Sequence, residues 1–150
     1  MADLTGAERV IVDAWIPSAI STVAIQLESI SKGLSSRVYL DMAPDGTTYP
    51  FIIFQTQDDP TNVRGVGTVT IMVTTLYLIK VVAATDYISI GNIVALIDTV
   101  LTTATGATPS IGGRVLSSVK NKGFSLTEVA DGKLLRNLGG LYNIVVQGKA

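Results

Sequence analysis

The sequence of 150 residues contains neither cysteine nor histidine, and only 15% of its residues are charged. Without cysteine the chain has no disulfide framework, no thiolate zinc site and no thiol nucleophile. Without histidine it lacks the side chain that most often acts as a general base or a metal ligand near neutral pH. These absences exclude the commonest catalytic and metal chemistries, and they favour a structural subunit over an enzyme.

Charge of one sign is not in excess either. Eleven Lys and Arg stand against twelve Asp and Glu, so the chain has no net field that would hold nucleic acid or an acidic membrane. The longest apolar run, Val69 to Ala84, falls short of the ~18 residues of a membrane span, and Lys80 interrupts it. The N-terminus lacks the basic and apolar segments of a signal peptide. We expect no membrane partner and no cofactor.

Apolar residues, in contrast, are abundant at 47% of the chain. A domain of this size hides apolar surface less completely than a larger one. We therefore expect part of this surface to be covered by other copies or by neighbouring proteins.

Two helices are predicted near the N-terminus. The first covers Ala7 to Ile16, and Pro17 is expected to end or restart it, because proline disfavours helical geometry in the residue before it and suits a first turn. From Pro17 onward, apolar residues recur at helical spacing up to Ile30. This pattern predicts a second helix with Lys32 in its last turn and Gly33 as its cap.

Short strands and a loop are predicted next. Strands are expected at 37–40 and 49–55, separated by a turn at 44–46 in which proline and glycine supply the required backbone angles. The polar stretch from Gln57 to Gly67 is expected to form an exposed loop.

The long segment Thr68 to Ala84 alternates as a β-strand does. Its odd positions are almost all apolar, whereas its even positions are polar in the first half and mostly apolar in the second. Both faces of the second half must therefore be covered. Either the strand is central within its own domain, or a neighbouring subunit covers part of the second face.

The last third predicts one helix and three strands. Thr85 and Asp86 are expected to cap a helix whose apolar stripe runs to Leu101, and a flexible connection follows from Thr102 to Gly113. Strands are expected at 114–119, 124–129 and 140–147, with hairpin turns at 120–123 and 130–133. Together these elements predict a single α+β domain over residues 1–150, with a mainly antiparallel sheet and helices packed on one face.

Candidate chemical groups are few and poorly placed. Asp58 and Asp59 are adjacent in a polar loop, where their side chains diverge, so a solvated loop is favoured over an active-site pair. The glycines at 65 and 67 precede a strand, whereas a phosphate-binding loop follows a strand and opens a helix. Ser117 and Ser118 have no histidine to activate them. No catalytic, cofactor-binding or metal-binding residue is assigned.

Residues 114–136 carry a local excess of positive charge. Five bases oppose two acids there, and the bases include Lys120 and Lys122 on the predicted hairpin. Two interpretations remain open: ordinary solvated hairpin charge, or a basic collar that forms around a phosphate backbone when several subunits close a ring. Trp15, the only tryptophan, is interpreted as a core or interface anchor.

The order of these landmarks resembles a known family. The segment Arg37 to Tyr39, the polar turn, the segment Tyr49 to Ile52, the long apolar strand followed by a helix, and the closing strands are similar to the tail terminator proteins of long-tailed bacteriophages, also called tail completion or head-tail joining proteins. The resemblance covers about residues 18–147, and residues 1–17 are left open as an N-terminal extension or arm.

The resemblance implies a structural virion protein of the phage neck, assembled in the host cytoplasm. It implies an α+β subunit in a ring, a hexamer in this family, on the head-proximal end of the tail tube. The ring's partners would be copies of itself, the tail tube protein and a neck or connector protein, with DNA passing through the bore without sequence-specific binding. Such proteins have no catalytic residues to transfer to this chain.

A ring with heterologous contacts buries one apolar face of each subunit against a different face of the next. The candidate subunit contacts are Trp15, Leu76, Leu78 and Val82. The candidate loops facing the bore or an axial partner carry Asp58, Asp59, Arg64, Lys120 and Lys122. Two alternatives stay open: another neck or tail component, such as a head completion or tube protein, and, in a different class, a small-ligand-binding or hydrolytic α+β domain with a pocket.

Overall fold

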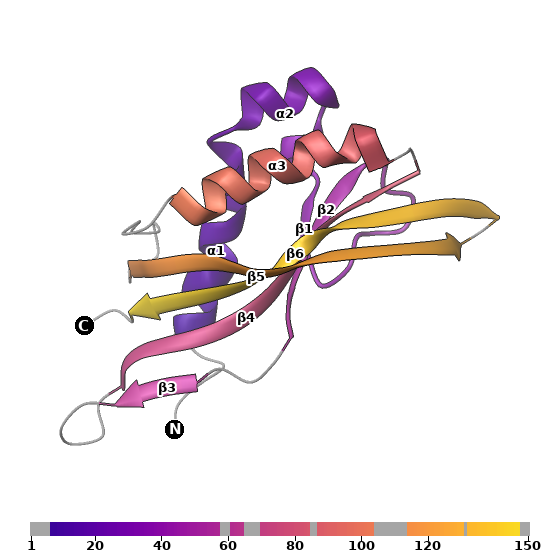
Figure 1. Cartoon of the computed structure of the whole chain (residues 1–150). Helices are drawn as coiled ribbons and strands as arrows, with labels where there is room; N and C mark the ends of the chain where they lie inside the picture. The colour runs from indigo at the N-terminus through magenta and orange to yellow at the C-terminus, as the bar shows by residue number, and fades with distance from the viewer. Residues whose placement is uncertain are drawn as a thin grey trace.

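The computed structural model of the chain describes residues 7–57, 61–64, 70–84, 87–103, 114–130 and 132–147. These residues form a sheet with helices packed on one side of it (Figure 1). The helices are α1 (Ala7–Ser21), α2 (Ala24–Ile30), the short 3-10 helix η1 (Leu34–Ser36) and α3 (Tyr87–Thr103). The strands are β1 (Val38–Leu40), β2 (Phe51–Thr56), β3 (Thr61–Arg64), β4 (Thr70–Ala83), β5 (Arg114–Ala130) and β6 (Lys133–Gln147).

The sheet is mainly antiparallel, as predicted. Its main path runs β1-β2-β4-β6-β5, and β3 pairs with the start of β4 beside this path. Only the pairing of β1 with β2 is parallel among the described strands. β1 and β5 are therefore the two edges of the main path, and the long β4 and β6 form its centre.

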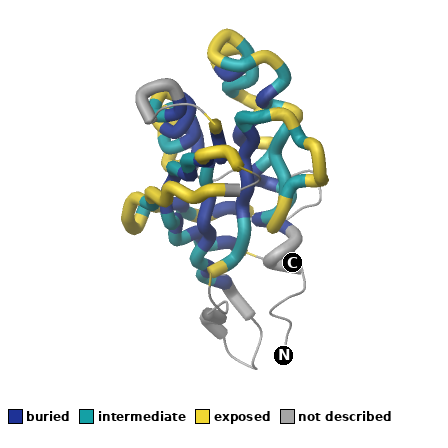
Figure 2. Tube along the Cα trace, turned by 90° about the vertical axis from the view of Figure 1, so that its right-hand side faces the viewer, coloured by how far each residue is buried: buried dark blue, intermediate teal, exposed yellow. Residues whose placement is uncertain are grey.

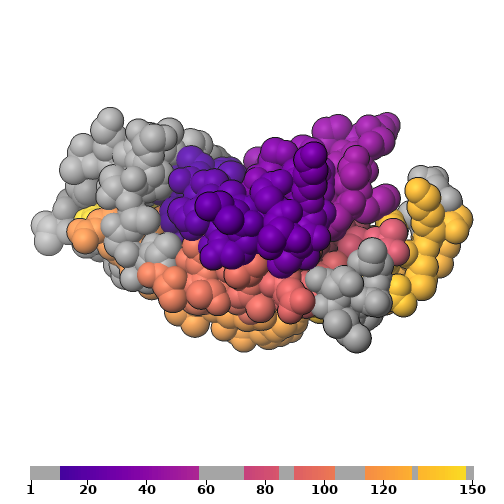
Figure 3. Space-filling view, turned by 90° about the horizontal axis from the view of Figure 1, so that it is seen from above, coloured from indigo at the N-terminus to yellow at the C-terminus, as the bar shows by residue number. Residues whose placement is uncertain are grey.

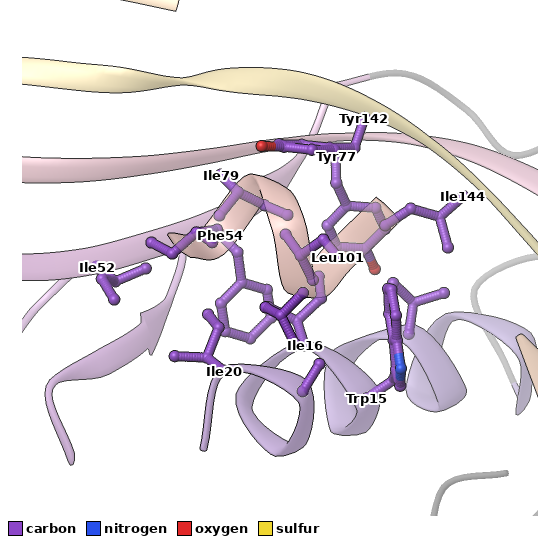
Figure 4. Packing of buried hydrophobic residues seen from close by; sticks show 14 of the residues in the cluster. Trp15, Ile16, Ile20, Ile52, Phe54, Tyr77, Ile79, Leu101, Tyr142 and Ile144 are labelled. Carbon is purple, nitrogen blue, oxygen red and sulfur yellow. The ribbon is translucent and has the colours of Figure 1, made fainter. Parts of the chain in front are cut away.

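The main core lies between the helices and the sheet. Figure 4 shows Trp15, Ile16 and Ile20 of α1 directed toward the side chains of the sheet. On the sheet, β4 and β6 contribute Tyr77 and Ile144. The Tyr77 hydroxyl donates to Asp13 Oδ1 of α1 at 2.7 Å, which satisfies a polar group at the edge of this apolar layer.

The prediction that Pro17 ends or restarts the first helix is wrong. α1 continues through Pro17 to Ser21. A proline inside a helix removes one hydrogen bond and costs about 3 kcal/mol. Apolar side chains on both sides of it, including Trp15 and Ile20, are buried against the sheet, and this burial offsets the loss. Of residues 1–17, left open as an N-terminal extension or arm, residues 1–6 lie outside the described residues and residues 7–17 form the first part of α1.

The helix predicted from Pro17 to Lys32 is divided. α1 ends where the amides of Thr22 and Val23 turn back to the carbonyls of Ala19 and Ile20, and the seven-residue α2 follows. Lys32 lies beyond the end of α2 instead of in its last turn. Gly33 adopts a φ of 79°, the left-handed conformation expected of a residue that follows a helix.

Part of the predicted loop at 57–67 is a strand. Thr61–Arg64 forms β3 and pairs with β4, with a register shift next to Arg64. The sequence analysis missed this strand because its residues are mostly polar. A strand at the margin of a sheet need not alternate between apolar and polar residues. Residues 58–60 and 65–69, which include Asp58 and Asp59, lie outside the described residues, as do the predicted cap at 85–86 and the connection from 104 to 113.

The predicted hairpin turn at 120–123 is also wrong. β5 runs unbroken through these residues and pairs with β6 along its whole length, with a register shift between Lys120 and Lys122. A bulge of this kind absorbs an extra residue, here Asn121, and bends the ribbon without reversing it. The predicted turn at 130–133 is confirmed, since Ala130 pairs with Lys133 and Gly132 has a φ of 73°.

Candidate assembly surface

The sheet has one face under the helices and one face away from them, which we call the open face. A small second cluster lies on the open face at the β2 end, where Phe51, Ile53, Val82 and Leu135 are buried. Ala43 and Tyr49, from the loop between β1 and β2, pack against it. The sequence left open whether this part of β4 is covered by its own domain or by a neighbouring subunit. In the structure, the loop of the same copy covers it.

Most of the predicted contact residues are already covered within one copy. Trp15 is 3% exposed and belongs to the main core, and Leu78 and Val82 are each 5% exposed. Leu76 is half-buried on the open face. Trp15, Leu78 and Val82 therefore have little surface left to offer another subunit.

Lys120 is held by the body of the molecule. Its Nζ lies 2.7 Å from Asp98 Oδ2 of α3, and the hydroxyl of Tyr142 donates to the other carboxylate oxygen of Asp98. A Cβ at Gly140 would lie 2.7 Å from Lys120 Cε, so the absence of a side chain at residue 140 makes room for the lysine stem. This cluster ties α3 to β5 and β6, which makes Lys120 a structural residue in this copy.

The other predicted charged residues are spread along the sheet. Lys122 is exposed on β5, which is an edge strand and not a loop tip. Arg64 ends β3. The structure therefore does not bring Arg64 and Lys122 together in one loop cluster, and Asp58 and Asp59 lie outside the described residues.

A surface that the sequence did not predict lies along β5 and the tip of the β5–β6 hairpin. Large apolar side chains are exposed there, and they are Leu116, Val119, Leu126, Val129 and Leu134. In Figure 2 the hairpin is marked by a run of exposed residues, and Figure 1 shows it extending beyond the helices. An edge strand with exposed apolar side chains is a template for pairing with another chain. The strand order that places β5 at the edge has no signature in the sequence.

The opposite edge of the sheet is also partly apolar. Leu40 at the end of β1 is 40% exposed, and Met42 in the loop that follows is 75% exposed. Asp41 lies between them in the sequence and is exposed as well. Asp41 has a φ of 67° and its amide donates to Phe54 O at 3.0 Å, so this corner is held against β2.

A groove of about 570 Å³ separates the β1–β2 loop from the hairpin tip. Residues 43–49 line it together with Phe51 and Lys133. The Tyr49 ring stacks on Phe51, and Lys133 Nζ lies 5.8 Å from the centre of the Tyr49 ring. Figure 3, viewed from above, shows the β6 end of the hairpin standing clear of the helices. The aromatic and cationic contacts hold the loop and the hairpin beside each other.

Glu28 anchors the connection from α2 to β1. Its carboxylate accepts hydrogen bonds from the Ser35 hydroxyl at 2.6 Å and from the amide of Gly33. These hydrogen bonds, that of Ser35 first, lower the pKa of Glu28 below its ordinary value. These hydrogen bonds hold the segment that leads into β1, the strand that ends at Leu40.

The described residues offer few groups that could form a polar or metal-binding site. Within them, no three potential ligands among His, Cys, Asp and Glu gather to hold a metal ion. The unpaired buried polar atoms found in the described part of the chain, Ser118 Oγ and Asn137 Oδ1, belong to separate strands. No helix in the same part is long and apolar enough to cross a membrane. Among the described residues, the candidate surfaces are the exposed strand edges and the groove beside the β1–β2 loop.

Comparison with known proteins gives a likeness of fold. No protein-family model matches the chain, and no curated protein matches it. Among solved structures it is similar to a chain from the virion of a native gene transfer agent particle, with a TM-score of 0.69. The match covers 99% of this chain and 100% of that chain at 15% sequence identity. The two chains therefore share one fold over their whole lengths.

Proposed function

We propose that this chain is a structural protein of a phage-like virion. The observation that carries the proposal is the likeness, over the full length of both chains, to a component of a gene transfer agent virion. The proposed location is the virion, and the proposed role is assembly without catalysis.

Within that class, we propose a ring-forming subunit of the tail terminator type in the neck. Its ring, a hexamer in the family that the sequence resembles, would cap the head-proximal end of the tail tube and join it to a neck or connector protein. DNA would pass through the bore without sequence-specific contact. Support comes from the order of elements from Arg37 onward and from the exposed apolar strand surface, which a closed ring buries.

The experiment is an assembly assay with the tube protein from the same particle. Tubes are polymerised with and without this chain, and their lengths are measured by negative-stain electron microscopy. If the chain is a terminator, the tubes are shorter and limited in length, and each has a ring at one end. The chain by itself, without tube protein, forms a ring of the same diameter.

Two other outcomes assign the chain to a different component. Open tubes formed by this chain alone indicate a tube protein. A ring that binds the connector and leaves tube length unchanged indicates a head completion protein. A chain that neither forms a ring nor binds tube or connector contradicts the proposal.

A further inference from the structure

The two edges of the main sheet are aligned across the molecule. One row of paired residues crosses all five strands, from Leu40 through Phe54, Ile79 and Gly140 to Gly123. One residue further in the same direction, Leu141 pairs with Lys122, while Asp41 follows Leu40. Asp41 and Lys122 therefore lie at opposite ends of the sheet and at the same level.

These two groups belong to edges of opposite charge. The β1 edge, comprising Leu40, Asp41 and Met42, has one exposed acid. The β5 edge, comprising Arg114, Val119, Lys122 and Leu126, has two exposed bases. Four strand spacings of about 4.8 Å separate the edges within one copy, so Asp41 and Lys122 do not reach each other there.

Charges of the opposite sign near each edge are engaged locally. Arg37, just before β1, donates to Pro50 O, Lys32 O and the Ser31 hydroxyl. Glu128 of β5 accepts from Asn137 Nδ2 at 3.0 Å. These hydrogen bonds hold the Arg37 and Glu128 side chains against their own copy, and Asp41 and Lys122 are the exposed, oppositely charged pair at the same level of the sheet.

Both edges also expose apolar side chains. Met42 and Leu40 on one edge are 75% and 40% exposed, and Val119 and Leu126 on the other are 59% and 47% exposed. Two such surfaces are complementary when their charges are opposite and their apolar side chains can be buried against each other. The surface that is complementary to the β1 edge of one copy is therefore the β5 edge of a second copy.

We propose that the β5 edge of one copy binds the β1 edge of the next copy, with Lys122 facing Asp41 and the exposed apolar side chains of the two edges packed beside this pair. This inference rests on the proposed function, because it identifies the subunit contact of the proposed ring. The contact is heterologous, so its repetition gives a ring if the rotation closes and a filament if it does not. A two-fold contact between identical edges would instead place like charges together.

The test is a charge exchange between the two edges. Asp41→Lys and Lys122→Glu are made separately in the full chain, and the concentration at which the chain associates is measured by light scattering. Each variant alone places like charges across the contact, which raises that concentration by at least about tenfold. In a 1:1 mixture every contact regains opposite charges if the two variants alternate, so association returns and rings contain an even number of subunits.

Lys32→Glu is the matched control, since it makes the same charge change at an exposed lysine in the helix layer. It leaves the association concentration unchanged. Each variant changes an exposed residue, so we expect it to remain folded, and circular dichroism checks this.

Two results overturn the inference alone: an effect of one edge variant without the other, or a mixture that associates no better than its parts. A wild-type chain that stays monomeric with and without tubes overturns the proposed function together with it.

Discussion

Substitution of Gly139 by alanine should weaken the centre of the sheet. A Cβ at residue 139 would lie 2.0 Å from Ile79 O and 2.6 Å from Lys80 Cα, whereas ordinary van der Waals contact begins at 3.4 Å. Both neighbours are backbone atoms of β4, so the added methyl group must push the two central strands more than an ångström apart. Overpacking costs about 1–3 kcal/mol even where side chains yield, and here we expect about 3 kcal/mol or more.

Urea unfolding followed by tryptophan fluorescence measures this effect directly. Trp15 is the only tryptophan and is buried in the main core, so its emission reports loss of the packed state. With a denaturant slope of about 2 kcal/mol per molar, a loss of about 3 kcal/mol lowers the midpoint by about 1.5 M.

Gly123→Ala is the matched control in the neighbouring strand. None of the atoms counted as neighbours lies within 4 Å of the Cβ that this substitution adds. The free energy of unfolding should stay level or rise by about 0.4–1 kcal/mol, because alanine reduces the entropy of the unfolded chain, and the midpoint should follow it. If Gly139→Ala unfolds at the same urea concentration as Gly123→Ala, the close approach of β4 and β6 is refuted.

Three further substitutions test separate parts of the structure. Trp15→Ala should destabilise the isolated subunit by about 3–5 kcal/mol, because it empties a core site; urea unfolding of this variant is followed by circular dichroism, since no tryptophan remains, and unchanged stability would place Trp15 at an interface instead. Lys120→Met should lower thermal stability, because it leaves Asp98 with the Tyr142 hydroxyl alone, and Asp98→Asn should suppress the effect in a double-mutant cycle; independent effects would argue against the ion pair. Glu28→Gln should destabilise the chain at pH 7, and this effect should shrink as the pH falls below the ordinary carboxyl pKa of 4.5. The folded pKa of Glu28 is lowered, so its contribution is present above the unfolded pKa and is lost as pH falls through the folded value. A wild-type-to-variant difference that stays constant as the pH is lowered from 7 through the acid range would contradict this assignment.

The fold class could be predicted because two periodicities are strong in this sequence. The stripe that includes Ile93, Ile97 and Leu101 packs α3 on the sheet, and the alternation from Val73 to Ala83 gives β4 its buried face. Where local signals failed, tertiary structure had overridden them. Pro17 is tolerated because the helix around it is buried, and the polar residues at 120–123 continue a strand because β6 pairs with all of it.

The assembly surface was harder to predict because it depends on strand order. Periodicity shows that Leu78 and Val82 need cover, but it cannot distinguish a loop of the same copy from another subunit. The loop that packs beside Val82 has no apolar pattern of its own. Exposed Val119 and Leu126 look like core residues in the sequence, and only their place on the edge strand makes them candidates for a contact.

The molar mass of the purified full-length chain in solution, measured by light scattering with and without tail tubes, tests the central claim most directly. A ring-forming virion subunit gives a single mass that is a whole-number multiple of 15.8 kDa and does not grow further with concentration. A mass that remains at 15.8 kDa at every concentration and in the presence of tubes would contradict the account.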